Sequence, residues 1–148
     1  MIFLNKASYS GILFDGYPRS LEQYNFLNNT VAKDWMGYAI YLEISLDQLL
    51  DRLLFRRICG SCGAVFNIKH LPSKTGDSCD KCGTLLGSRS DDTNQQIIEN
   101  RFKVFNEGVI PIIEKYKLEN KLITVQADQA VAKISTELDA IFKKIMHV

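Results

Sequence analysis

Four cysteines form two C-x-x-C pairs, a spacing that lets one tight turn bring two sulfurs to a metal ion. The pairs are Cys59 with Cys62 and Cys79 with Cys82, and a glycine follows each pair. Their separation fits the spacing of zinc sites, and four thiolates leave no open coordination position, so we predict a structural zinc. Free core cysteines and a redox pair are the alternatives, and the duplicated spacing favours the metal. His70 lies between the pairs, and we interpret it as exposed rather than as a fifth ligand.

Arginines on separate segments suggest a second kind of chemistry. They are Arg19, Arg52, Arg56, Arg89 and Arg101. Guanidinium groups can clamp phosphate through two hydrogen bonds, and phosphoryl transfer is stabilised chiefly by positioned cations. For Arg52 and Arg56, which lie four apart on the polar face of a predicted helix, a solvated helix face is the alternative. Spacing alone does not show that the arginines converge.

The segment Gly11–Ser20, GILFDGYPRS, has the glycine spacing of a phosphate-binding loop but lacks its other residues. Tyr17 and Pro18 stand where that loop requires Lys and Ser or Thr. The apolar run Gly11–Asp15 instead predicts a buried parallel strand that ends in a carboxylate and a turn. The carboxyl ends of such strands are where α/β folds place ligands.

Helices are predicted where a capping box precedes apolar residues at helical spacing. The boxes begin at Ser20, Ser45 and Thr93. Leucines of the second helix, between Leu46 and Leu54, are expected to form a buried face. Gly108 and Pro111 are expected to interrupt or bend the third helix. Residues from Val131 to Ile145 predict an amphipathic C-terminal helix.

Strands are predicted at Tyr38–Ile44 and Lys121–Gln126 in addition to Gly11–Asp15. Strands that alternate with helices indicate an α/β layer architecture. Helical periodicity stops between Ile58 and Ser90, which indicates an insertion held by something other than a hydrophobic core. The expected division is a core made of residues 1–57 and 91–148, with a small insertion at 58–90.

Composition and charge set limits on partners. The chain has 148 residues, of which 46% are hydrophobic and 24% charged, as in an ordinary globular protein. Its net charge of +1 gives no reason to expect a nucleic acid or membrane partner. We find no signal-like segment or membrane span, and paired cysteines suit a reducing compartment, so the expected location is the cytoplasm.

These motifs resemble those of the adenylate kinase family, in the same order and over most of the chain. They are Asp15-Gly-Tyr-Pro-Arg19 with Gln23, the Arg52-x-x-x-Arg56-Arg57 helix, the cysteine-bearing insertion and Arg89-Ser-Asp91-Asp92. The resemblance implies a three-layer core like that of P-loop kinases, with a parallel sheet and a zinc-bound lid at 58–90. It also implies reversible phosphoryl transfer from ATP to AMP, giving two ADP, with magnesium.

The resemblance implies roles on the AMP side of the site. Asp15 would hold the magnesium ion, Arg19 would bind the phosphate of AMP, and Gln23 would read its adenine. The alternative for Asp15 is a plain helix or turn cap. Gln23 has an equally strong alternative, because a capping box uses the same side chain.

On the ATP side, the resemblance places Arg52 on the adenine, with further arginines around the phosphates as the lid closes. Those arginines are Arg56, Arg89 and Arg101, braced by Asp91. Ala127 stands where the family usually has a glycine beside the adenine of ATP, which is expected to alter a backbone contact.

The resemblance begins in the middle of the family's chain, so the glycine-rich loop and its lysine are absent from this sequence. The central strand, between Gly11–Asp15 and Tyr38–Ile44, would be absent too, leaving an open sheet. We therefore expect the activity of this chain alone to be impaired. The open sheet also offers an edge for self-association, although the resemblance implies a monomer. Alternatives are another nucleoside monophosphate kinase, an inactive nucleotide-binding remnant, and a zinc-ribbon module for nucleic acid.

Overall fold

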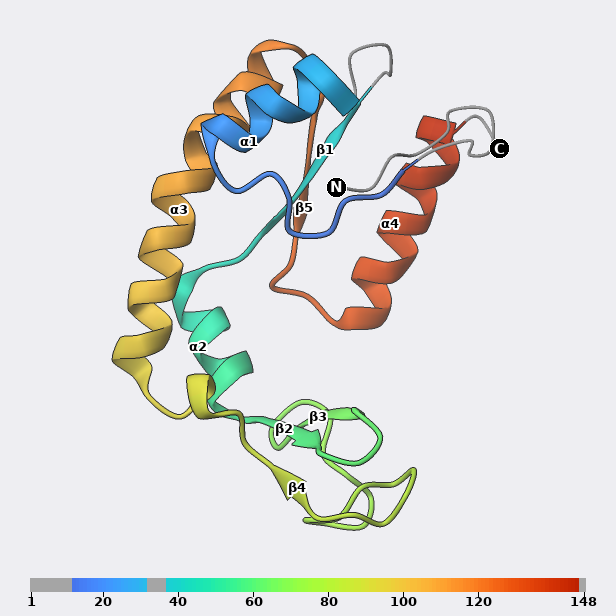
Figure 1. The fold of residues 1–148 in the computed structure, drawn as a ribbon. Coiled ribbons are helices and arrows are strands. Elements are labelled where there is room, and N and C mark those ends of the chain that lie inside the picture. The colour runs from blue at the N-terminus through green and yellow to red at the C-terminus, as the bar shows by residue number, and fades with distance from the viewer. Residues whose placement is uncertain (1–11, 32–36, 147–148) are drawn as a thin grey trace.

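A two-stranded parallel sheet lies at the centre of the larger lobe (Figure 1). The computed structural model describes residues 12–31 and 37–146. Strand β1 (Ala39–Glu43) pairs with β5 (Leu122–Gln126), with Ala39 opposite Leu122. Both strands lie within the segments predicted from the sequence.

Helices cover both faces of this sheet, α3 (Gln95–Leu118) on one and α4 (Val131–Met146) on the other (Figure 1). Side chains of a parallel strand alternate between the two faces, and each face has its own apolar cluster. The α3 side contains Tyr24, Ile112, Tyr116, Ala39 and Leu122, and the α4 side contains Val125, Ala127, Ile134, Ile40, Ile44, Leu138 and Ile141. The α/β prediction with a parallel sheet is confirmed.

The first described helix begins where its capping box predicts. Ser20 Oγ accepts a hydrogen bond from the Gln23 backbone N–H at 3.3 Å, and α1 (Leu21–Phe26) follows it. The helix continues as the π-helical turn η2 (Leu27–Val31). Tyr24 is the residue that docks α1 on α3, because its ring meets Tyr116 edge-on at 5.2 Å between centroids.

The leucine face of α2 (Leu46–Leu54) is less buried than its spacing predicts. Ser45 caps the helix as expected, through a 3.3 Å bond from the Gln48 N–H to its hydroxyl. However, no residue of α2 is fully buried. Among the described elements, α2 packs mainly against α3, so one neighbour covers only part of the apolar stripe.

Helix α3 corrects two predictions. Its N-cap is Asn94, whose side chain accepts from the Gln96 N–H at 2.8 Å, rather than Thr93. It also runs unbroken through Gly108 and Pro111, so the expected interruption is wrong, whereas the alternative, a bend, is compatible with a continuous helix. Pro111 has no backbone N–H to donate to the Glu107 carbonyl, but Glu107 is exposed, so water can satisfy that carbonyl.

Neither α3 nor any other described helix combines the length and apolarity that a bilayer crossing requires.

The predicted strand at Gly11–Asp15 is wrong for its described part. Residues 12–14 are not in a strand, and Asp15 begins a bend. Leu13 is 75% exposed and Phe14 is 40% exposed, rather than buried. A strand needs a neighbour for its backbone hydrogen bonds, and none of the described strands pairs with this segment.

The lid is a small antiparallel sheet with its own core. It contains β2 (Arg56–Cys59), β3 (Val65–Asn67) and β4 (Leu86–Gly87) in the order β3-β2-β4, and the 3-10 turn η3 (Ser90–Asp92) leads back to α3. Its apolar cluster contains Cys59, Phe66, Cys79, Ala64 and Leu86. Because two of these residues are predicted metal ligands, the lid core and the metal site are one unit.

Candidate functional site

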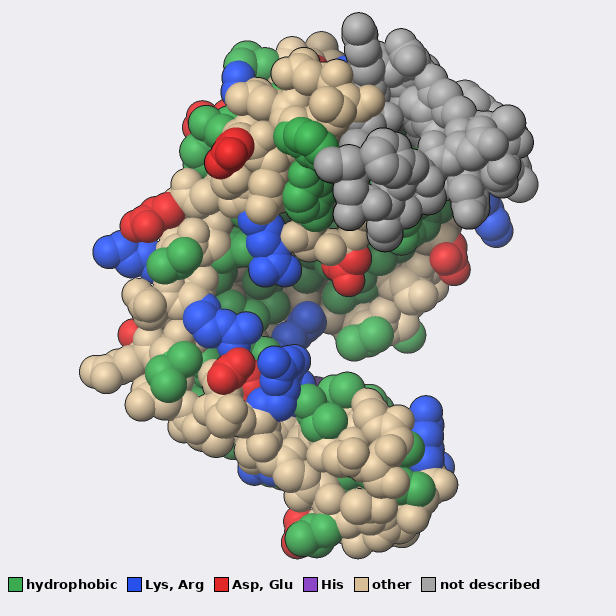
Figure 2. All heavy atoms as spheres, in the orientation of Figure 1, with side chains coloured by type: hydrophobic (Ala, Val, Ile, Leu, Met, Phe, Trp, Pro, Cys, Tyr) green, Lys and Arg blue, Asp and Glu red, His purple; other side chains and the backbone are tan. Residues whose placement is uncertain are grey.

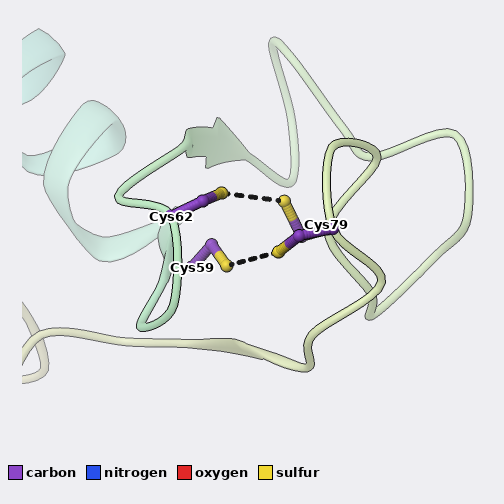
Figure 3. Close-up of side chains that lie close together, drawn as sticks. Cys59, Cys62 and Cys79 are labelled. Atoms are coloured by element: carbon purple, nitrogen blue, oxygen red, sulfur yellow. Dashed lines mark hydrogen bonds between the residues drawn. The ribbon is translucent and has the colours of Figure 1, made fainter.

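The four cysteines predicted to bind metal meet in the lid (Figure 3). Their sulfurs all lie within 4.8 Å of one another. Cys59 Sγ and Cys82 Sγ are 3.4 Å apart, and Cys62 Sγ and Cys79 Sγ are 3.6 Å apart. These separations are close to those across a tetrahedral zinc site with Zn–S bonds of about 2.3 Å. The donor set and its geometry therefore fit a zinc ion.

Two matched turns aim the sulfurs at one point. Gly63 and Gly83 have φ angles of 70° and 75°, a conformation that glycine adopts at low cost. In each turn the glycine N–H donates to the carbonyl of the first cysteine of its pair, at 2.9 Å for Cys59 and 2.8 Å for Cys79. The local sequence C-x-x-C-G therefore explains the shape of each half-site.

Crowding and local hydrogen bonds shift the pKa values of neighbouring thiols in opposite directions. Hydrogen bonding to the Thr84 side chain, and then to its backbone N–H, lowers the pKa of Cys82 to about 6. Although the Ala64 N–H lowers it, the neighbouring thiols raise the pKa of Cys62 to about 11. A divalent metal removes this conflict because it neutralises the charge of the neighbouring thiolates.

Asp80, which the sequence analysis did not identify, braces the loop beside the second cysteine pair. One carboxylate oxygen accepts from Ser73 Oγ at 2.6 Å, from the Lys74 N–H at 2.9 Å and from the Thr75 N–H at 3.3 Å. The bond from Ser73, followed by those from Thr75 and Lys74, lowers the pKa of Asp80. The loop 73–75 is thereby tied to the residue next to Cys79.

The arginine cluster lies where the lid joins the larger lobe. Arg56 binds Asp92 through two nitrogens, Nε at 2.7 Å and Nη2 at 2.5 Å from the same carboxylate oxygen. Asp92 is only 2% exposed, so this is the buried member of the cluster. The sequence analysis noted Asp92 only as part of a motif. Asp92 is therefore a residue that the sequence analysis missed: a buried carboxylate that positions Arg56, which is predicted to bind phosphate.

Asp91 holds the other two predicted arginines from the exposed side. Its Oδ2 lies 3.6 Å from Arg89 Nη2 and 3.9 Å from Arg101 Nη1. Three arginines from β2, the lid exit and α3 thus converge on two adjacent carboxylates. Figure 2 shows Lys and Arg side chains gathered beside the notch between the lobes. This arrangement can bind a polyphosphate that enters the notch.

Arg52 joins α2 to the loop after β5. Its Nη2 donates to the Gln129 carbonyl at 2.8 Å. Ala127, at the start of this loop, is 6% exposed, and its N–H donates to the Glu43 carbonyl at 2.7 Å. Two residues predicted to contact the adenine of ATP therefore lie on segments that touch each other.

The turn that carries Arg19 is held by its own hydrogen bonds. Arg19 Nε donates to the Gly16 carbonyl at 2.6 Å, and the Arg19 backbone N–H donates to Gln23 Oε1 at 2.7 Å. This bond comes from the residue before the cap rather than from the Ser20 N–H that a capping box uses, so it matches neither interpretation of Gln23. Asp15 is exposed at the bend before Gly16. Within residues 12–31 and 37–146, no ion pair joins this turn to the arginine cluster.

A second lid contact was also missed by the sequence analysis. Asp51 on α2 binds both Lys69 and His70 of the lid, and Lys69 Nζ lies 3.9 Å from the centre of the Phe55 ring. The Ile68 N–H donates to the Phe55 carbonyl at 2.9 Å. The side chain of His70 is 58% exposed, as expected, and lies outside the cysteine cluster.

Comparison with known proteins matches residues 56–91 to the family model described as "Adenylate kinase, active site lid". The chain is 35% identical over 140 residues to an adenylate kinase of Thermosipho melanesiensis, covering 93% of this chain and 62% of that protein. It is 40% identical over 128 residues to an adenylate kinase of Fervidobacterium nodosum, covering 84% and 57%. An adenylate kinase of Clostridium tetani is 36% identical over 140 residues, with 89% and 63% covered. The chain therefore spans about three fifths of the length of these relatives.

Proposed function

Because this chain belongs to the adenylate kinase family, we propose that its protein catalyses phosphoryl transfer between ATP and AMP, giving two ADP. The observation that best supports this is the convergence of Arg56, Arg89 and Arg101 on Asp91 and Asp92. Three guanidinium groups gathered in one place suit the charge spread over a phosphoryl group in transit.

In the proposed reaction, a phosphate oxygen of AMP attacks the γ-phosphorus of ATP, and the bond to the β–γ bridging oxygen breaks. The arginine cluster stabilises the transferring group, while Arg52 and the loop from Ala127 hold the adenine of ATP. When bound, magnesium supplies charge neutralisation between the phosphates. Asp15, an exposed carboxylate beside the Arg19 turn, is the residue proposed to hold it.

For the acceptor, we propose that Arg19 binds the phosphate of AMP and that Gln23 reads the adenine. The bond that Gln23 makes to the Arg19 backbone N–H links these two functions in one turn. Competition among AMP, CMP, UMP and GMP tests the assignment. If another monophosphate wins, the protein is a nucleoside monophosphate kinase of different specificity.

We propose that the lid binds one structural zinc ion through Cys59, Cys62, Cys79 and Cys82. Four thiolates fill a tetrahedral site, so the metal has no position for substrate. Thiolate ligands also favour a reducing location such as the cytoplasm. Elemental analysis of reduced, purified protein is expected to show one zinc per chain, and its absence would contradict this proposal.

We further propose that this chain alone has little activity. No G-x-x-x-x-G-K-[ST] motif occurs in its sequence, and the backbone and lysine of such a loop normally cradle the β- and γ-phosphates. The decisive assay measures ADP formation from ATP and AMP, with and without the unmatched part of a relative's chain as a separate polypeptide. Activity only after addition supports the proposal.

Two other results of this assay would change the conclusion. Full turnover by the chain alone would contradict the impairment. No activity in either case, with the protein shown to be folded, would favour a nucleotide-binding remnant.

Because the described sheet has only two strands, we also propose self-association through its edge, which sedimentation can test. We propose no nucleic acid or membrane partner.

A further inference from the structure

Gly108 makes room for the backbone of the Arg19 turn. A Cβ atom added to Gly108 would lie 2.5 Å from the Arg19 carbonyl oxygen and 3.7 Å from its carbonyl carbon. Non-bonded protein atoms do not approach a Cβ atom this closely. The clashing atom here belongs to the backbone, which cannot move aside as easily as the end of a flexible side chain. Only glycine permits this contact between α3 and the turn.

The turn has little freedom to move away from such a clash. Arg19 is tied on one side by its backbone N–H to Gln23 Oε1 and on the other by its Nε to the Gly16 carbonyl. The next residue, Ser20, caps α1, and α1 is docked on α3 through Tyr24. A shift of the Arg19 carbonyl must therefore move the guanidinium group or separate α1 from α3.

Helix propensity alone does not explain why a glycine stands at position 108. It lies inside the 24-residue helix α3, where glycine is less favourable than alanine. The close approach of Arg19 supplies a reason for it.

We propose that Gly108 is a positioning residue, which sets the place of the Arg19 guanidinium group and so the affinity for the phosphate of AMP. This inference rests on the proposed function for the identity of the ligand. The juxtaposition of Gly108 with the Arg19 backbone does not depend on that function.

The test is Gly108→Ala in the zinc-loaded full chain, with AMP binding measured by titration calorimetry. We expect AMP affinity to fall about tenfold or more, as misplaced binding groups commonly cause, while zinc content stays unchanged. The matched control is Gly87→Ala, because a Cβ at Gly87 meets nothing within 4 Å. It should bind AMP as the parent does.

A double-mutant cycle with Arg19→Ala separates positioning from general damage. If Gly108 acts through Arg19, adding Gly108→Ala to Arg19→Ala should reduce AMP affinity little further. Parent-like AMP affinity in Gly108→Ala, together with the raised Tm that alanine normally gives a helix interior, would overturn the proposal. Additive losses in the cycle would overturn it as well.

A third readout distinguishes failure of this inference from failure of the proposed function. NMR can follow hydrogen exchange at Arg19 Nε, whose hydrogen is bonded to the Gly16 carbonyl. Faster exchange in Gly108→Ala supports positioning even if the parent shows no affinity for AMP, a result that would contradict the proposed acceptor. Unchanged exchange would overturn the positioning role whatever AMP does.

Discussion

Asp92 is the residue whose chemistry matters most to the arginine cluster. One of its oxygens binds Arg56 twice, and the other, Oδ1, is buried with no hydrogen-bond partner among the described residues. A carboxylate buried in this way is costly unless its charge is compensated. Arg56 and Asp92 therefore depend on each other. Asp92 holds the Arg56 guanidinium group in place, and Arg56 compensates the buried charge of Asp92.

Asp92→Asn should destabilise the protein by about 2 kcal/mol, because it removes the charged partner from a largely buried hydrogen-bonded pair. The matched control is Asp91→Asn, since Asp91 is 52% exposed and its two ion pairs are long. That change should cost no more than about 0.5 kcal/mol. Urea unfolding of both variants measures the difference, and equal losses would show that burial of Asp92 does not matter.

At the scale of elements, helix α1 is attached to α3 by a buried tyrosine. The Tyr24 hydroxyl donates to Glu119, whose other oxygen accepts from Lys121 Nζ at 2.8 Å. Burial, followed by the bond to Glu119, raises the pKa of Tyr24 to about 12. The bond from Lys121, followed by that from Tyr24, lowers the pKa of Glu119. One short network thus links the two helices.

Tyr24→Phe should lower the free energy of unfolding by about 1 kcal/mol, the usual net value of such a bond. It should also remove part of the loss of unfolding free energy that the parent shows as pH rises into the alkaline range. Because the folded pKa of Tyr24 is raised, its contribution is complete below the unfolded value near 10 and is lost as pH rises towards about 12. Tyr17→Phe is the control and should retain that loss. An unchanged alkaline limb in Tyr24→Phe would contradict the assignment.

The contact of Asp51 with Lys69 and His70 attaches the lid to α2. The bond from Lys69, followed by that from His70, lowers the pKa of Asp51, so its contribution is present above its ordinary pKa and is lost as pH falls. Asp51→Asn should speed hydrogen exchange of the nearby Ile68 amide, with Asp47→Asn on the same helix as control. If acid lowers the protection factor of this amide equally in the parent and in Asp51→Asn, the ion pair does not hold the junction.

At the scale of the whole molecule, the lid and the larger lobe have separate cores. The lid cluster depends on Cys59 and Cys79, whereas the two clusters around the sheet contain no metal ligand. The two parts should therefore differ in their dependence on metal.

Chelation of zinc should unfold the lid while the sheet of the larger lobe persists, because metal binding free energy is folding free energy for the lid. Hydrogen exchange measured by mass spectrometry should show loss of protection in 58–90 and retained protection in β1 and β5. Cys62→Ser should reproduce the loss without a chelator. Loss of protection throughout the chain would show that both lobes depend on the metal.

Features set by neighbouring residues could be predicted from the sequence. The cysteine turns, the caps at Ser20 and Ser45 and the amphipathic α4 depend on spacings of a few residues, and the structure has all of them. Turn and helix geometry relates such residues wherever the segment lies in the fold. The order of motifs also identified the family, which the comparisons confirm.

Features that join distant segments were decided by the tertiary structure. The pairs Arg56 with Asp92 and Arg52 with the Gln129 carbonyl connect elements far apart in the chain. The strand predicted at Gly11–Asp15 fails in its described part because pairing requires a neighbour, which no local pattern can supply. Gly108 was expected, with Pro111, to interrupt or bend a helix, and only the approach of Arg19 shows why it is there. Local spacing determines how a segment folds, and packing between segments determines which side chains meet.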